Sequence, residues 1–173
     1  MEFTSLSNLS TARLQLRPLE LSDDNEIFVL RSSEIINQYI SRKRASDKEE
    51  ALQFINKVNN NFKKNESLYW GINLNENPQL IGTICLWNFT EDRKTAEIGY
   101  ELFPEFQGKG IMDEALKKVI KTAFQKIGVN TLEAFTHKNN LRSKGLLLRN
   151  NFVHAPDRKD EDDENNIIFV LKK

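Results

Sequence analysis

The stretch that most constrains the fold of this chain is a strand, a glycine loop and a helix in direct succession. Residues 95–103, TAEIGYELF, alternate apolar and polar side chains with the period of two that is typical of a half-buried strand. The loop PEFQGKG follows, and residues 111–127 then repeat apolar side chains at helical spacing. We therefore predict a strand that turns through Gly108 and Gly110 into a long helix, which Gly128 ends as a C′ glycine.

The other segments also alternate between these two periods, which predicts an α/β fold. Further strands are predicted at residues 13–19, 68–74, 80–90, 131–137, 151–155 and 167–173. Helices are predicted at 22–40, with a division near 31–33, at 46–62 and at 139–150. The second of these helices opens with a capping box, SDKE, in which Ser46 is the cap and Glu49 its partner. A mixed, mainly antiparallel sheet of six or seven strands flanked by helices accommodates this order.

Length and charge narrow the class of protein further. A chain of 173 residues can close one sizeable core, so we predict a single domain over residues 1–173. Twenty-five basic residues balance 25 acidic ones, which argues against nucleic acid or an anionic membrane as a partner. Cys85 has no partner for an internal disulfide, and neither a signal peptide nor an apolar run of membrane-spanning length is recognisable. We expect a soluble, cytoplasmic protein.

Two interpretations of the glycine loop remain open on these grounds. A glycine-rich turn before a helix leaves unpaired amides at the positive end of the helix dipole, which is an anion site. Alternatively, Gly108 and Gly110 only shape a tight connection. A short Gly-x-Gly is weak support, because the dinucleotide fingerprint GxGxxG and the P-loop motif are both absent.

The order of the motifs resembles the GCN5-related N-acetyltransferase (GNAT) superfamily, which binds acetyl-CoA. Its signature, Gln/Arg-x-x-Gly-x-Gly/Ala, matches residues 107–112, QGKGIM, except at the last position. The chain looks most like the branch of RimJ/RimL-type ribosomal-protein N-acetyltransferases. The resemblance covers nearly the whole chain and rests on TARLQLRPLELSDD, IGTICLWNF, AEIGYELFPEFQGKGIMDEAL and Asn140-x-x-Ser143, followed after a fixed gap by Asn151-Phe152. Asn151 stands where most members have glycine, and asparagine also tolerates the left-handed conformation of a helix C′ position.

Several cofactor-binding residues follow from the resemblance. Backbone amides would hold the pyrophosphate of acetyl-CoA, and these belong to Gly108, Lys109, Gly110, Ile111 and Met112. Gln107 would shape that loop, and the sheet would be splayed beside it to admit the cofactor. The strand from Tyr100 to Phe103 would present backbone groups to the pantetheine arm, with Leu102 and Phe103 as its main contacts. Asn140 would also contact this arm. Ser143 would lie near the thioester.

The resemblance also implies candidates for proton transfer. A base must deprotonate the acceptor ammonium before it can attack, and Glu97 matches the strand carboxylate of some members. Glu97 is alternatively an ordinary polar residue on an exposed strand face. Glu101, on the same strand face, is the reserve candidate. The tyrosine that many members use as general acid falls at Leu147, so Ser143 or a water would have to donate the proton.

The predicted function is therefore acetyl transfer from acetyl-CoA to a primary amine by direct attack. The resemblance favours the α-amine of a protein or peptide, of the ribosomal-protein type. A polyamine, a drug-like amine and a non-catalytic acyl-CoA-binding module are the alternatives, and a homodimer is left open. His137 and His154 stand alone without metal-ligand spacing, so no metal is expected.

Overall fold

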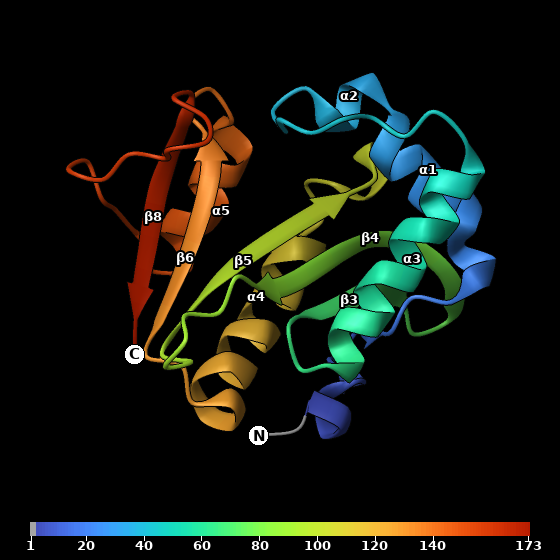
Figure 1. Ribbon diagram of the computed structural model, residues 1–173, viewed down its shortest axis with the longest axis horizontal. Helices are drawn as coiled ribbons and strands as arrows, with labels where there is room; N and C mark the ends of the chain where they lie inside the picture. Colours follow the sequence, from blue (N-terminus) through green and yellow to red (C-terminus); the bar gives the residue numbers. More distant parts are fainter. Residues whose placement is uncertain (1–2) are drawn as a thin grey trace.

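Eight strands form one continuous sheet in the computed structural model, which describes residues 3–173 (Figure 1). The strands are β1 (Leu9–Ser10), β2 (Leu14–Arg17), β3 (Leu68–Leu74), β4 (Asn77–Trp87), β5 (Thr95–Leu102), β6 (Thr131–His137), β7 (Val153–His154) and β8 (Asn166–Lys172). Their order across the sheet is β1-β2-β3-β4-β5-β6-β8-β7. All neighbours are antiparallel except β5 and β6, which are parallel. The predicted mixed, mainly antiparallel α/β fold is confirmed, and β1, a strand of two residues that was not predicted, brings the count to eight instead of six or seven.

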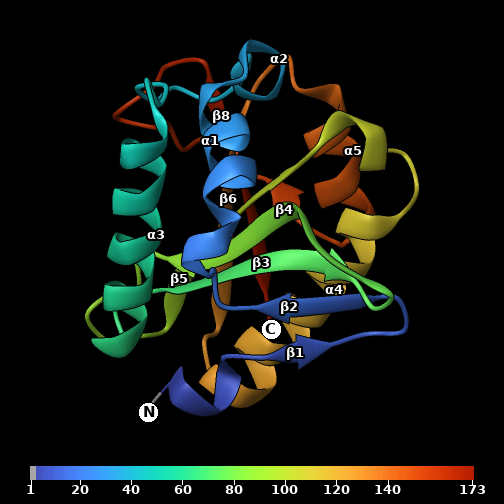
Figure 2. The ribbon, with the colours of Figure 1, turned by 90° about the vertical axis from the view of Figure 1, so that its right-hand side faces the viewer.

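Helices cover both faces of this sheet. The α-helices are α1 (Asp24–Ser32), α2 (Glu34–Asn37), α3 (Lys48–Lys63), α4 (Ile111–Thr122) and α5 (Leu141–Arg149). Short 3₁₀ segments lie at Phe3–Leu6, Leu21–Asp23 and Pro104–Phe106, and a π-helical turn at Ala123–Ile127 extends α4. Figure 2 shows α1 and α3 on one side of the sheet and α4 and α5 on the other. No helix within residues 3–173 is long and apolar enough to cross a membrane.

The apolar residues that recur at helical spacing in the sequence form the buried faces of the helices. Ala115 and Val119 of α4 are fully buried against the strand residues Trp70 and Leu86 in the larger core cluster. On the opposite face, a smaller cluster packs α1 and α3 onto the sheet through Ile27, Leu30, Ala51, Ile55 and Leu80. Two apolar layers thus sandwich the central strands, which fixes the position of β5 between them.

Three local predictions hold and two need correction. The predicted division of the first helix occurs at Ser33, which caps α2, and Gly128 has the left-handed φ of 85° expected of a C′ glycine. Asn151, which stands where relatives carry glycine, also has a positive φ of 64°. The cap of α3 is Asp47 instead of Ser46, because the Asp47 carboxylate accepts from the amide of Glu50. The Glu50 carboxylate in turn accepts from the amide of Ser46, the residue before the cap, so the predicted pairing of Ser46 with Glu49 is not formed.

The start of β4 is the second correction. The sequence predicts strands at residues 68–74 and 80–90 with a turn between them, but β4 begins at Asn77 and includes Pro78. The register between β3 and β4 shifts between Ile72 and Leu74, so the extra residues form a bulge there. A bulge accommodates proline, which cannot donate to the strand ladder.

The parting of β5 and β6 is the feature that shapes the site. Their pairing runs only from Thr95 to Glu97 on β5, opposite Thr131 to Glu133 on β6. Beyond Glu97, β5 pairs only with β4 as far as Leu102, while β6 continues alongside β8 (Figure 1). The predicted splay of the sheet is therefore present, and it leaves one edge of β5 without a neighbouring strand.

Candidate active site

The glycine loop lies where β5 ends and α4 begins. Gly108 and Gly110 have φ values of 75° and 72°, a left-handed conformation that most side chains disfavour. Gly110 is the N-cap of α4, so the first amides of the helix have no acceptor within it. A Cβ atom on Gly108 would meet nothing within 4 Å, so the space beside this glycine is open, whereas one on Gly110 would meet Arg13 at 3.6 Å. These amides fit the pyrophosphate of a bound nucleotide cofactor.

The acidic side chains in the first turn of α4 do not occupy the place of an anion at the helix start. Asp113 pairs with Lys117 at 2.7 Å and accepts from Asn150. Glu114 pairs with Arg13 at 2.6 Å. Both carboxylates are thereby held by other partners, and an anion at the helix start would not face two free negative charges.

Two arginines that the sequence analysis did not identify brace the loop. Arg13, at the start of β2, donates to the carbonyl of Lys109 at 3.1 Å and so ties the loop to the N-terminal strands. Arg142 of α5 donates to the side-chain oxygen of Gln107. Both contacts escape a reading of the loop sequence, because each arginine reaches the loop from a distant part of the chain.

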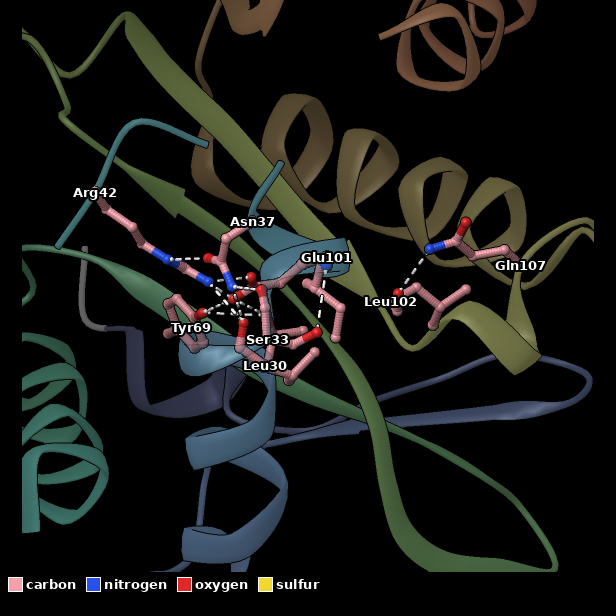
Figure 3. Close-up of polar contacts among 10 residues, drawn as sticks. Leu30, Ser33, Asn37, Arg42, Tyr69, Glu101, Leu102 and Gln107 are labelled. Atoms are coloured by element: carbon pink, nitrogen blue, oxygen red, sulfur yellow. Dashed lines mark hydrogen bonds and ion pairs between the residues drawn. The ribbon is translucent and has the colours of Figure 1, made fainter. Parts of the chain in front are cut away.

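Gln107 connects the loop to β5. Its side-chain amide donates to the carbonyl of Leu102 at 2.9 Å (Figure 3). The Leu102 carbonyl, which was predicted to contact pantetheine, therefore has an internal donor, while the amide of Phe103 donates to Ile81 on β4. Backbone groups for a pantetheine arm must come chiefly from the part of β5 between Glu97 and Leu102.

Ser143 and Asn140 lie across the gap from β5. Asn140 caps α5, since its side-chain oxygen accepts from the amide of Ser143 at 3.1 Å. The hydroxyls of Ser143 and Tyr100 lie 2.9 Å apart and join α5 to β5. Leu147, where many relatives carry a tyrosine, is fully buried. Tyr100 is the hydroxyl that the sequence analysis missed, because it was considered only for its backbone.

Glu97 stands at the point where β5 and β6 part. Its carboxylate accepts a hydrogen bond from Asn88 and has no basic partner among the described residues. Burial raises its pKa above the ordinary glutamate value, and the neighbouring carboxylate of Glu133 adds to the rise, while the bond from Asn88 opposes it. Trp87 lies opposite Glu97 on β4 and is 49% exposed. The carboxylate is thus half-buried, ionisable and next to an open aromatic side chain.

Glu101 shares this strand face but has a different environment. Its carboxylate forms an ion pair with Arg42 at 2.7 Å and also accepts from Tyr69 and Thr83, each at 3.4 Å (Figure 3). Arg42 in turn donates to Asn37 at 2.7 Å, which ties the segment after α2 to β5. Glu101 is therefore part of a structural polar network, whereas Glu97 is not.

Two further groups complete the surroundings of the gap. The rings of Tyr39, which follows α2, and His137, at the end of β6, lie 5.3 Å apart and join the segment after α2 to β6. Burial raises the pKa of the Cys85 thiol to about 12, so this cysteine is neutral and unreactive at ordinary pH. Among residues 3–173, no group of histidine, cysteine or acidic side chains is arranged to hold a metal ion.

A splayed strand edge beside an anion-binding helix start, with a carboxylate and a hydroxyl pair at the gap, defines the class of acyl-CoA-dependent acyltransferases. The chain belongs to the GNAT acetyltransferase family, whose domain model matches residues 13–153. It is an N-acetyltransferase that uses acetyl-CoA.

Known proteins similar to the chain agree with this assignment. The Uncharacterized N-acetyltransferase YoaA of Bacillus subtilis (strain 168) is 30% identical over 144 residues, which are 83% of this chain and 81% of that protein. RimL, a ribosomal L7/L12 α-N-protein acetyltransferase solved with coenzyme A, superposes with a TM-score of 0.81 at 18% identity, covering 94% of this chain and 95% of its own. The microcin C7 self-immunity acetyltransferase MccE, solved with acetyl-CoA and AMP, gives a TM-score of 0.78 at 20% identity and covers 94% of each chain. These last two likenesses show a shared fold.

Proposed function

We propose that the chain acetylates the α-amino group of a protein or peptide, with Glu97 as the general base. The observation that carries this proposal is the half-buried, unpaired carboxylate of Glu97 at the parting of β5 and β6. An α-ammonium has a pKa of about 7.7–8.0, whereas that of a lysine ammonium is about 10.4. Proton transfer to the Glu97 carboxylate therefore costs less free energy from an α-ammonium than from a lysine ammonium.

The contrast between the two glutamates supports the choice of base. A base must be free to accept a proton, and the Glu101 carboxylate is only 8% exposed and already held by Arg42. Glu97 makes one hydrogen bond to a neutral amide and keeps lone pairs for an acceptor. Glu101 is better described as a residue that holds the segment after α2.

The remaining site residues take the roles that the resemblance suggests. Amides from Gly108 to Met112 hold the pyrophosphate, and Gln107 and Arg13 keep the loop in shape. Acetyl-CoA supplies the activated acetyl group. Glu97 accepts the ammonium proton, and the hydroxyl of Ser143 faces the leaving sulfur. The name of RimL agrees with an α-amine acceptor, and its identity to this chain supports no finer choice of protein.

A small-molecule amine is the second candidate. Three carboxylates surround Glu97 closely enough to raise its pKa, and they belong to Glu133, Asp160 and Asp162. Negative charge around the base would also favour a polycationic amine. The name of MccE, a self-immunity acetyltransferase, shows that a protein of this fold can act outside ribosomal-protein modification.

A paired acceptor assay separates the two candidates. CoA release from acetyl-CoA is measured with a peptide that has a free α-amine and acetylated lysines, and with the same peptide carrying an acetylated N-terminus and free lysines. Spermidine and a panel of small amines are the third arm. Turnover confined to the free α-amine supports the proposal, and turnover confined to spermidine or small amines contradicts it. Product mass after digestion identifies the nitrogen that is modified.

A further inference from the structure

The hydroxyls of Tyr100 and Ser143 form a pair between β5 and α5. Packing of the core alone would not require these two polar groups. Tyr100 lies on the part of β5 that pairs with β4 alone, three residues past the last residue that pairs with β6. Its ring packs against the larger core cluster, and its hydroxyl lies 2.9 Å from that of Ser143 in the first turn of α5. The Ser143 amide is fixed separately by the side chain of Asn140 at 3.1 Å. Ser143 is thus held from both its backbone and its hydroxyl.

The chemistry of the two hydroxyls decides which one donates. A phenol is a stronger acid than an alcohol, so the Tyr100 O–H is the better donor and the Ser143 oxygen the better acceptor. Burial raises the pKa of Tyr100 to about 12, so the phenol keeps its proton throughout the neutral range. With its oxygen accepting from Tyr100, Ser143 must direct its own O–H to another acceptor.

We propose that Tyr100 is a positioning residue that orients the hydroxyl of Ser143 toward the sulfur of the leaving thiolate, and so replaces the function lost with Leu147. This inference rests on the proposed acetyl transfer and adds a residue to it. In a chain with a tyrosine at position 147, that phenol would approach the sulfur directly. Here the phenol comes from β5 and acts through the serine of α5.

The step balances without deprotonating either hydroxyl. Glu97 accepts one proton from the acceptor ammonium, and the neutral nitrogen forms a bond to the thioester carbonyl carbon. The carbon–sulfur bond breaks with its electron pair on sulfur, and the nitrogen loses its second proton to water as the amide forms. The sulfur leaves as a thiolate and accepts the hydrogen bond of the Ser143 O–H. An ordinary thiol has a pKa near ~8.5, well below that of Tyr100, so full transfer of the phenol proton would be unfavourable.

A double-mutant cycle tests this inference. Tyr100→Phe, Ser143→Ala and the double variant are compared by single-turnover CoA release from acetyl-CoA, with the acceptor found in the amine and peptide panel and with water as acceptor. Because one neutral hydrogen bond is lost, Tyr100→Phe should slow the chemical step about 3- to 10-fold, with acetyl-CoA affinity changed less than about twofold. In the Ser143→Ala background, the same substitution should have no further effect.

The matched control removes a buried hydroxyl elsewhere. Thr122 of α4 is 3% exposed and donates to the carbonyl of Lys118 at 2.9 Å, so Thr122→Val should leave the rate unchanged. An unaffected Tyr100→Phe, or losses that multiply in the double variant, would overturn the role of Tyr100, as would an equal loss in the Thr122 variant. A wild-type chain that releases no CoA with any acceptor contradicts the proposed function itself.

Discussion

At the scale of single residues, the position of Glu97 determines both its basicity and the free energy that its charge takes from the folded state. It lies opposite Glu133 in the last pair that joins β5 to β6, so two carboxylates face each other across parallel strands. Arg158 neutralises Glu133 through two hydrogen bonds, the longer of 2.9 Å, which leaves Glu97 as the member without an ion pair. Burial disfavours its charged form and raises its pKa, which makes it a better base and a less stable anion.

The first prediction concerns the pH dependence of Glu97. The ionised carboxylate is the active form, so kcat/KM should fall as pH drops through its raised pKa, at a higher pH than for an exposed glutamate. Glu97→Gln should lose about 10² or more in rate and lack this acidic limb. Because a raised pKa means that ionisation destabilises the folded state above that pKa, the variant should also melt higher at neutral pH. The pH–rate profile and the thermal midpoint are the two measurements.

Glu133→Gln is the matched control for that experiment. It removes a negative charge that raises the pKa of Glu97, and it frees Arg158 close by, so the acidic limb should move to lower pH while activity persists. If Glu97→Gln kept the wild-type profile, the base would have to be sought elsewhere, and a limb that moved to higher pH in Glu133→Gln would contradict the electrostatic account.

At the scale of elements, the segment after α2 is held to the sheet by polar contacts. Arg42 donates to the Leu30 carbonyl at 3.0 Å and to Asn37 at 2.7 Å, in addition to its ion pair with Glu101 on β5 (Figure 3). Tyr39 lies between these anchors and contacts His137 of β6. The network therefore holds an otherwise irregular segment against β5, and Tyr39 joins that segment to the end of β6.

The second prediction separates this holding role from catalysis. Arg42→Met leaves the nearly buried Glu101 carboxylate without its partner and should destabilise the fold by about 3–5 kcal/mol. The acidic limb of the pH–rate profile should remain, since Glu97 is untouched, while KM for the acceptor rises. Lys43→Met is a suitable control, because the Lys43 ion pair with Glu50 is 83% exposed on the lysine side. A lost acidic limb in Arg42→Met would return Glu101 to the role of base.

The elements that the sequence predicted well are those determined by local chemistry. The bounds of β3 and β6 agree with their period-2 runs, and the start and end of the helix after the glycine loop follow from Gly110 and Gly128. The turn through the glycine loop was predicted for the same reason, since its glycines and the helix start are contiguous. The Pro78 bulge was missed because it depends on the register of a neighbouring strand.

Contacts between distant residues account for the rest of what was missed in the site. Arg42 and Glu101, Tyr100 and Ser143, and Arg13 and the glycine loop each meet only after the sheet has formed. Period-2 alternation placed Glu97 and Glu101 on one face, but it could not show that only one of them has an arginine partner. Choosing between the two carboxylates required the packing of the segment after α2.

At the scale of the whole molecule, two parts of the sheet meet over a short seam. β6, β7 and β8 join the rest of the sheet through three residue pairs between β5 and β6. Beyond that seam, side-chain contacts such as those of Tyr100 with Ser143 and Asp113 with Asn150 span the gap. A cofactor that contacts both β5 and α5 would add to this limited connection, so binding should stabilise the whole molecule.

The last prediction uses two glycines that differ only in their position. Gly108 and Gly128 both have positive φ, 75° and 85°, and a Cβ on either would meet nothing within 4 Å. Gly108→Val and Gly128→Val should therefore lower the thermal midpoint by similar amounts, from backbone strain of roughly 1–2 kcal/mol.

At ~100 times its Kd, acetyl-CoA stabilises the folded protein by ~2.7 kcal/mol, which for a chain of this length raises the midpoint by about 5–10 °C. Wild type and Gly128→Val should show that rise and Gly108→Val should not, because its side chain stands where the phosphates approach the amides. Equal rises in all three would place the pyrophosphate elsewhere, whereas loss in both variants would mean that strain alone, transmitted through α4, prevents binding.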